Sequence, residues 1–63
     1  MNENKIRELR EQRGLTQLQV AYAVGTTPQT IYNIESGKTK SPSLETVKAI
    51  ARFYGVPIEE LLS

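Results

Sequence analysis

Four widely spaced glycines divide this sequence into short segments: Gly14, Gly25, Gly37 and Gly55. Each glycine follows a stretch with apolar residues at helical spacing. A glycine commonly ends a helix there, because it adopts the left-handed backbone conformation at little cost. No segment shows the sustained alternation of apolar and polar residues that indicates a strand. The pattern therefore predicts an all-α fold built from short helices.

Residues that favour helix starts stand between the glycines. Thr16, with Gln19 three residues later, has the spacing of a capping box. Thr27 followed by Pro28 has the order of an N-cap and a first helical residue, and Ser43 has the type and place of a further N-cap. These signals predict five helices, at about 3–13, 17–24, 28–36, 44–54 and 57–62.

Apolar side chains at helical spacing indicate one core shared by the five helices. A chain of 63 residues removes about 60% of its unfolded surface from water, so we expect residues 1–63 to form a single domain. The expected core residues are Ile6, Leu9, Leu15, Val20, Ala21, Val24, Ile31, Ile34, Leu44, Val47, Ile50, Ala51, Tyr54, Val56, Ile58, Leu61 and Leu62.

The composition argues against an enzyme. Cysteine and histidine are absent, which excludes disulfides, thiolate metal sites and every catalytic arrangement that uses a histidine base. Glu59 and Glu60 are adjacent and point in different directions, so they do not form a catalytic carboxylate pair. The glycines are single, unlike those of a phosphate-binding loop. We therefore expect neither catalysis nor a cofactor.

Membrane and export signals are also absent from the sequence. No apolar run approaches the roughly 20 residues that cross a bilayer. The residues 1–5 lack the basic and then apolar order of a secretion signal. We expect a cytoplasmic protein that has no membrane partner.

Charge is unevenly distributed along the chain, although the net charge is only +1. Between residues 14 and 43 the single acidic residue is Glu35, and two cations, Lys38 and Lys40, lie close together there. A net charge this small does not by itself indicate a nucleic-acid partner. The distribution nevertheless predicts that an anion would approach the middle of the chain.

The segments 17–24 and 28–36 form a tight pair of predicted helices. They are joined by Gly25-Thr26-Thr27, and a short connection that contains glycine is typical of the helix-turn-helix motif. Helices this short are not stable alone, so they must pack against the rest of the chain. Ala21 is expected where the two helices cross, because a larger side chain would push them apart.

A helical wheel divides the second helix of this pair into two faces. Ile31, Ile34 and Glu35 share the inward side. The outward side carries Gln29, Tyr32, Asn33 and Ser36. Glutamine and asparagine amides can form paired hydrogen bonds with adenine in the major groove. The helix starts near Gln17 and Gln29 offer N–H groups and a positive dipole end to phosphates.

With these features in place, the sequence resembles the Cro/cI-repressor family, also called the XRE family, and particularly the lambdoid phage repressors. The resemblance covers about residues 4–62 without a gap. It rests on Gly14-Leu15-Thr16-Gln17, Val20-Ala21, Val24-Gly25-Thr26-Thr27, Ile31, Ile34-Glu35, Gly37-Lys38-Thr39-Lys40, Pro42-Ser43-Leu44-Glu45-Thr46 and Gly55-Val56.

The resemblance implies a compact five-helix, lambda-repressor-like DNA-binding domain with its helix-turn-helix at about residues 17–36. Such a protein is a sequence-specific transcriptional regulator, here expected to be a small repressor. Its recognition helix enters the major groove, and it binds double-stranded DNA as a two-fold homodimer on an inverted-repeat operator. A chain this short leaves no room for an effector domain, so no small-molecule effector is expected.

The resemblance also implies roles for individual residues. The base-reading positions are Thr27, Pro28, Gln29, Tyr32 and Asn33, and the backbone-contacting positions are Gln17, Ser36, Lys38, Lys40 and Ser41. Pro28 departs from the related phage repressors, which carry a base-reading glutamine at this position. Proline cannot donate a hydrogen bond to a base edge, although it can touch a thymine methyl group, so the operator sequence is expected to differ.

Several of these residues also have simpler interpretations. Gln17 can be an ordinary surface residue of its helix, and Lys38 and Lys40 can be part of a solvated loop. Tyr32 can contact the DNA or merely shield its own helix. Arg10 and Glu35 lie on core-facing sides of their helices and are expected to pair, as in the family; alternatively, both extend to solvent.

The end of the chain carries an apolar group formed by Phe53, Val56, Ile58 and Leu62. Phe53 lies off the inward side of its helix, so these residues are a possible dimer contact. The simpler alternative is partial burial of Phe53 against the last helix. An alternative function is a protein-interaction module, which predicts an additional exposed apolar tail; the sequence has little beyond the last helix before Ser63.

Overall fold

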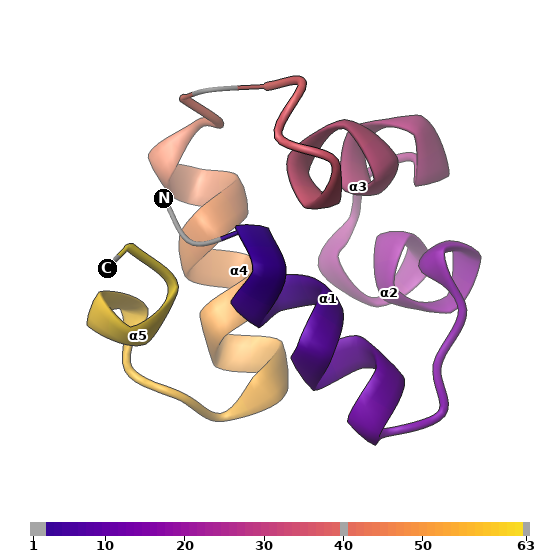
Figure 1. The fold of residues 1–63 in the computed structure, drawn as a ribbon, viewed down its shortest axis with the longest axis horizontal. Coiled ribbons are helices and arrows are strands. Elements are labelled where there is room, and N and C mark those ends of the chain that lie inside the picture. The colour runs from indigo at the N-terminus through magenta and orange to yellow at the C-terminus, as the bar shows by residue number, and fades with distance from the viewer. Residues whose placement is uncertain (1–2, 40, 63) are drawn as a thin grey trace.

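A computed structural model describes residues 3–39 and 41–62, with side chains from residue 5 onward. Within these residues the chain is all α-helical and contains no strand, as the sequence predicts. Figure 1 shows α2 and α3 together on one side of the molecule, with α4 and α5 on the other and α1 between them. The helices are α1 (Glu3–Gln12), α2 (Gln17–Val24), α3 (Pro28–Glu35), α4 (Leu44–Tyr54) and α5 (Ile58–Leu62).

The helix ends follow the expected start and stop signals. The side chain of Thr16 accepts a hydrogen bond from the backbone of Gln19, whose own side chain accepts one from the backbone of Thr16. The side chains of Thr27 and Ser43 each accept a hydrogen bond from a backbone N–H three residues later, and they cap α3 and α4 without the reciprocal bond. Gly25 ends α2 with φ 77°, in the left-handed region. Local hydrogen bonding therefore determines where most of the helices begin and end.

Three predicted boundaries differ from the structure by one residue. The first helix ends at Gln12 rather than 13, and the last begins at Ile58, after Pro57 rather than at it. The third ends at Glu35 because the backbone of Ser36 departs from helical geometry. The N–H of Ser36 still donates to the carbonyl of Tyr32, but the ψ of Ser36 is −7°. Such differences arise where a terminal turn tightens, and the sequence pattern does not resolve them.

The core lies where all five helices meet. α1 packs against α3 and α5, α2 packs against α3 and α4, and α4 packs against α5. Leu15, Val24, Val56 and Ile58 are half-buried against this core. The buried apolar residues are Ile6, Leu9, Val20, Ala21, Ile31, Ile34, Val47, Ile50, Ala51, Tyr54 and Leu61. Together these contacts hold the two helices of the tight pair, which are too short to be stable alone.

Two residues expected in the core are largely exposed, so that part of the prediction is wrong. Leu44 is 56% exposed, because it is the first residue of α4 and precedes the first buried position, Val47. Leu62 is 47% exposed, because its neighbour Leu61 fills the core position and adjacent helical residues point about 100° apart. Among the described helices, none has the length and apolar content needed to cross a bilayer.

Candidate nucleic-acid interface

The turn between α2 and α3 is held by backbone hydrogen bonds. The N–H of Thr26 donates to the carbonyl of Ala21 at 2.9 Å, and the N–H of Gly25 contacts the carbonyls of Ala21 and Tyr22. Ala21 is 1% exposed, as expected for a small residue at a close helix crossing. Thr27 then caps α3, with Pro28 in its first turn. The local sequence thus fixes α3 against α2 in a helix-turn-helix arrangement.

The two faces of α3 differ in the way that the helical wheel predicts. Ile31, Ile34 and Glu35 are buried. Thr27, Pro28, Gln29, Tyr32 and Ser36 are exposed, whereas Asn33 is half-buried. The exposed face of α3 therefore bears uncharged polar and aromatic groups. This is a surface suited to hydrogen bonding with a polar partner and not to burial within the same chain.

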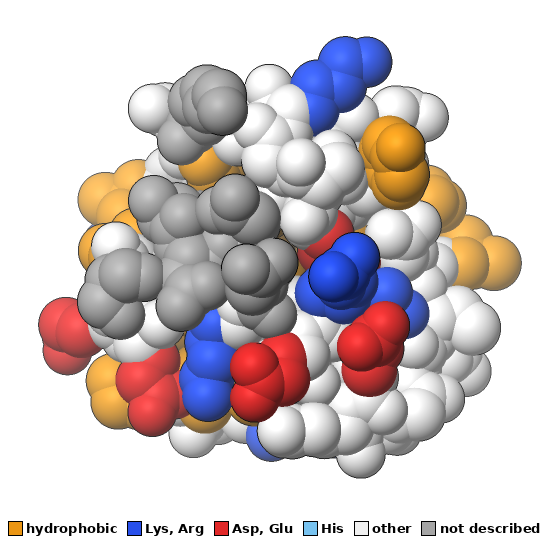
Figure 2. All heavy atoms as spheres, in the orientation of Figure 1, with side chains coloured by type: hydrophobic (Ala, Val, Ile, Leu, Met, Phe, Trp, Pro, Cys, Tyr) orange, Lys and Arg blue, Asp and Glu red, His pale blue; other side chains and the backbone are white. Residues whose placement is uncertain are grey.

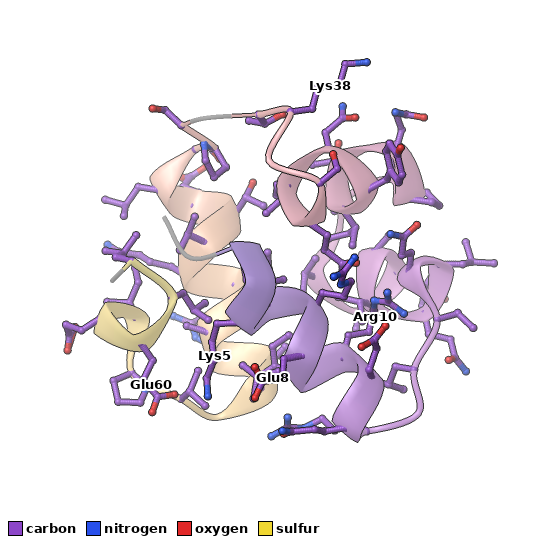
Figure 3. The ribbon with its side chains drawn as sticks, viewed as in Figure 1. Lys5, Glu8, Arg10, Lys38 and Glu60 are labelled. Atoms are coloured by element: carbon purple, nitrogen blue, oxygen red, sulfur yellow. The ribbon has the colours of Figure 1, made fainter. Side chains whose placement is uncertain are left out.

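The loop after α3 is fastened to the helix through the backbone carbonyl of Asn33. The N–H of Thr39 donates to this carbonyl at 3.1 Å, and the hydroxyl of Ser36 donates to it at 3.3 Å. Lys38 is exposed and extends from the molecule beside α3 (Figure 3). Ser41 is also exposed, while Lys40 lies outside the described residues. The fastening keeps a cation close to the end of the exposed face.

Glu35 is the centre of a buried polar network that joins α1, α2 and α3. Arg10 Nε lies 2.8 Å from Glu35 Oε2 and Arg10 Nη2 lies 3.0 Å from Oε1, so the ion pair predicted from the sequence is present and uses two hydrogen bonds. The side chains of Arg10 and Glu35 are 14% and 3% exposed. The hydrogen bond to Glu35 raises the pKa of Arg10 above its usual value, which keeps the guanidinium charged.

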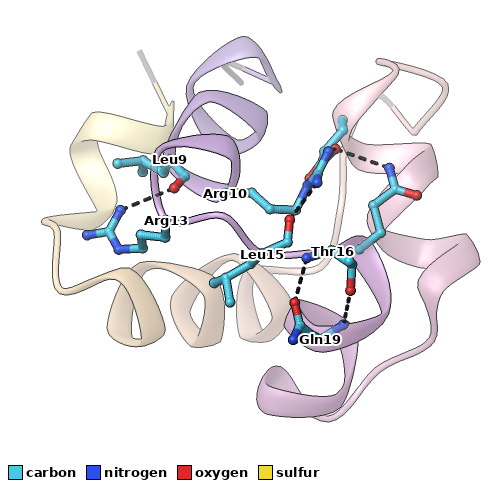
Figure 4. A network of polar contacts seen from close by, with 8 residues as sticks. Leu9, Arg10, Arg13, Leu15, Thr16 and Gln19 are labelled. Carbon is cyan, nitrogen blue, oxygen red and sulfur yellow. Dashed lines mark hydrogen bonds and ion pairs between the residues drawn. The ribbon is translucent and has the colours of Figure 1, made fainter.

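Gln17 joins this network, a contact that sequence reasoning missed. Its amide Nε2 donates to Glu35 Oε1 at 3.1 Å, and Arg10 Nη1 donates to the carbonyl of Leu15 at 2.9 Å (Figure 4). The amide of Gln17 is therefore held at the start of α2 rather than free in solvent. No spacing rule links position 17 with position 35, so the sequence alone offered no signal for the contact.

Another bond that sequence reasoning missed lies on α3 itself. Gln29 Nε2 donates to Asn33 Oδ1 at 2.9 Å, between residues four positions apart. Here a signal was available, because side chains at this spacing are neighbours on a helix and amide pairs form there. The two amides that sequence analysis placed at base-reading positions are therefore in contact with each other.

The exposed carboxylates lie outside α2, α3 and the loop that follows. Acidic side chains gather over α1 and α5 in the space-filling view, where Glu8 and Glu60 lie (Figures 2 and 3). Between residues 14 and 43 the sequence contains one carboxylate, that of Glu35, and it is buried and paired with Arg10. The surface of α2, α3 and the following loop can therefore approach a polyanion without exposed carboxylates of its own.

The opposite part of the fold contains the apolar group near the end of the chain. Phe53 is 40% exposed, and its ring lies 5.1 Å from that of Tyr54 at an angle of 55°. Val56 and Ile58 are half-buried against the core, while Leu62 is largely exposed. Phe53 and Leu62 therefore provide most of the apolar surface that remains accessible here.

Arg13 connects α1 to the end of α4. Its guanidinium donates to the carbonyl of Tyr54 at 2.9 Å and lies 5.0 Å from the centre of the Tyr54 ring. The Tyr54 hydroxyl is buried and has no hydrogen-bond partner within the described part of the chain. Burial raises the pKa of Tyr54 to about 12. These contacts stabilise the fold and lie apart from the exposed face of α3.

Comparison with known proteins agrees with this geometry. The helix-turn-helix family matches residues 6–61. The cryptic phage CTXphi transcriptional repressor RstR of Vibrio cholerae is 51% identical over all 63 residues, and the matched region is 56% of that protein. The transcriptional regulator DdrOP3 of Deinococcus deserti is 38% identical over 92% of this chain and 44% of its own length.

A third relative is close to this chain in length. The uncharacterized helix-turn-helix-type transcriptional regulator MJ0272 of Methanocaldococcus jannaschii is 43% identical over 92% of this chain and 86% of its own length. The chain thus spans about half the length of the phage repressor and the Deinococcus regulator, but most of the archaeal protein. The chain belongs to the helix-turn-helix family of Cro/cI-repressor (XRE) type.

Proposed function

We propose that this chain binds double-stranded DNA sequence-specifically and regulates transcription, as a small repressor. The observation that carries the proposal is the exposed face of α3, which bears the amides of Gln29 and Asn33 beside a surface without exposed carboxylates. A helix fits the width of the major groove, and amide side chains match base edges there. Membership of a helix-turn-helix family, and similarity to relatives named as transcriptional regulators, one of them a phage repressor, support the same function.

The base-reading surface proposed is the start and exposed side of α3. It consists of Thr27, Pro28, Gln29, Tyr32 and Asn33. Pro28 offers only apolar contact, such as with a thymine methyl group, because its ring nitrogen carries no hydrogen. The sequence preference therefore falls mainly on the two amides, with Thr27 and Tyr32 at the edges of the surface.

A second group is proposed to contact the sugar-phosphate backbone. It consists of Gln17, Ser36, Lys38, Lys40 and Ser41. Gln17 stands at the start of α2, where backbone N–H groups without a helical acceptor favour an anion. Its bond to Glu35 fixes the amide while leaving one N–H to donate to phosphate oxygen. Such contacts position the protein on the duplex without reading its sequence.

The chain is further proposed to act as a two-fold homodimer through Phe53, Val56, Ile58 and Leu62. Two recognition helices about 34 Å apart would enter successive major grooves of an inverted repeat. Phe53→Ala should weaken self-association in sedimentation on and off DNA, whereas Tyr22→Ala, an exposed aromatic change on α2, should not. Equal sedimentation of Phe53→Ala and the unchanged protein, where the latter is a dimer, argues against this contact.

Selection from a pool of random duplexes tests the proposed function. We expect an inverted repeat to be enriched, which gives the site, its symmetry and its spacing together. Gln29→Ala and Asn33→Ala should reduce discrimination at particular positions, each by about 1–3 kcal/mol. Lys38→Ala and Lys40→Ala should weaken binding to all sequences alike. Recovery of no preferred sequence from the pool contradicts the proposal.

A further inference from the structure

The hydrogen bond between Gln29 and Asn33 constrains what this pair of amides can recognise. Gln29 Nε2 donates to Asn33 Oδ1 at 2.9 Å, on the exposed side of α3. A primary amide has two donor hydrogens and one acceptor oxygen with two lone pairs. Once the two side chains are joined, both amide groups are held in one relative orientation. The pair then presents a fixed order of donors and acceptors rather than two independent groups.

The hydrogen bond between the two amides determines which of their donors and acceptors remain for a partner. Asn33 Oδ1 is occupied by Gln29, so Asn33 presents chiefly the two hydrogens of Nδ2. Gln29 keeps its oxygen as an acceptor and one hydrogen of Nε2 as a donor. Within the described residues, these remaining side-chain groups make no other hydrogen bond. Gln29 is thus a combined donor and acceptor, and Asn33 is a donor.

Base edges in the major groove differ in the groups that they present. Adenine presents the N7 acceptor beside the N6 donor, which matches the donor and acceptor that Gln29 retains. Guanine presents two acceptors and thymine presents the O4 acceptor, so both match the donors of Asn33. Cytosine presents only a donor, which the two Nδ2 hydrogens of Asn33 do not match, and one of the two lone pairs of Asn33 Oδ1 is already used by Gln29. Gln29 therefore favours adenine, whereas Asn33 favours guanine or thymine, whose acceptors have no donor beside them on the same base.

The spacing places these bases next to each other. Residues four apart on a helix are separated by about 6 Å along its axis, and base pairs are stacked about 3.4 Å apart. The hydrogen bond of 2.9 Å draws the two amides closer than the helix rise alone would. We infer that Gln29 and Asn33 read two neighbouring base pairs as one unit: an adenine, and beside it a guanine or thymine. This inference rests on the proposed function.

Asn33→Asp is the sharpest test of this unit. Aspartate keeps an oxygen that accepts from Gln29 but replaces the Nδ2 donors with a second acceptor. The preferred base at the Asn33 position should change to cytosine, while adenine stays preferred at the Gln29 position. The added negative charge lowers affinity for all duplexes, so the readout is the base preference in a random-duplex selection and not the overall affinity.

Asn33→Ala tests whether the two readings are coupled. It removes the oxygen that holds Gln29, so discrimination should fall at both base pairs and not only at the one facing Asn33. A good paired contact discriminates between the right and a wrong base by roughly 5- to 150-fold. In Asn33→Ala, most of this discrimination should be lost at the base pair facing Gln29 as well. Gln12→Ala is the matched control, because it removes an exposed amide that donates to Glu8 four residues away on α1.

The possible outcomes separate this inference from the proposed function. A change to cytosine in Asn33→Asp, with joint relaxation in Asn33→Ala and no effect of Gln12→Ala, supports the unit. The inference is overturned if the unchanged protein selects a defined site but Asn33→Asp selects the same bases, or if Asn33→Ala relaxes only one position. If the unchanged protein selects no sequence, the proposed function and this inference fail together. Circular dichroism confirms that each variant is folded.

Discussion

Removing Arg10 is the most informative perturbation of the fold. Arg10 makes two hydrogen bonds to Glu35, at 2.8 and 3.0 Å, and one to the carbonyl of Leu15, at 2.9 Å. Arg10→Met keeps an apolar stem of similar reach but removes all three. The carboxylate of Glu35 then stays in the core, 3% exposed, with the amide of Gln17 as its remaining partner.

The expected loss follows from the burial of this ion pair. Removing one partner of a fully buried pair costs about 3–5 kcal/mol. Because Arg10 retains 14% exposure, we expect a loss near the lower limit, about 3 kcal/mol. A chain of 63 residues has a total free energy of unfolding of about 3–9 kcal/mol. Arg10→Met should therefore remove a large part of the stability.

The assay is urea unfolding followed by circular dichroism, with trimethylamine N-oxide added so that weakened variants remain measurable. Arg10→Met/Glu35→Met should recover most of the loss, because apolar replacement of both partners is often nearly neutral. The interaction energy in this double-mutant cycle should be about 2–3 kcal/mol. Arg7→Met, an exposed change on the same helix, should cost less than about 0.5 kcal/mol. Equal losses in Arg7→Met and Arg10→Met would refute the reasoning.

Three further changes have expected outcomes. Burial raises the pKa of Tyr54 from 10.0 to about 12, so the folded protein holds the phenol proton more tightly than the unfolded chain. The stability that follows from this difference is present below pH 10 and is lost as the pH rises towards 12. At pH 8, Tyr54→Phe and the unchanged protein should unfold at similar urea concentrations. At pH 11, Tyr54→Phe should unfold at a higher urea concentration than the unchanged protein. Gly25→Ala should cost about 1–2 kcal/mol in urea unfolding, because φ is 77° and no atom crowds the added carbon; Gly25→Asn should cost less. Lys38→Ala should reduce the slope of log affinity against log salt by about 1, and an unchanged slope argues against a phosphate contact.

Most of the fold could be predicted because its signals are local. The capping box of Thr16 and Gln19 and the left-handed Gly25 each depend on residues within one turn. Helical spacing predicted the core residues correctly, except where a helix extends beyond the core. Leu44 matches the apolar stripe of α4 in spacing but lies in its first turn, before the packed positions. Spacing shows which side of a helix faces inward but not how far along the helix the core extends.

The candidate site was predictable to a lesser degree. The outward side of α3 and the pairing of Arg10 with Glu35 followed from helix faces and the family resemblance. The bond from Gln17 to Glu35 depends on how α2 and α3 cross, which is a property of the tertiary structure. The sequence also did not show that the Tyr54 hydroxyl finds no hydrogen-bond partner among the residues that the structure describes, because spacing predicts the burial of a tyrosine but not the partners of its oxygen.

Nuclear magnetic resonance of the labelled protein with its selected duplex tests most directly whether the exposed face of α3 enters the DNA groove. We expect the side-chain amide signals of Gln29 and Asn33 to shift strongly on binding, together with backbone signals at the starts of α2 and α3. Signals from Phe53 and the rest of the α4–α5 end should instead follow dimer formation. Unchanged Gln29 and Asn33 signals in a saturated complex would contradict the proposed binding mode.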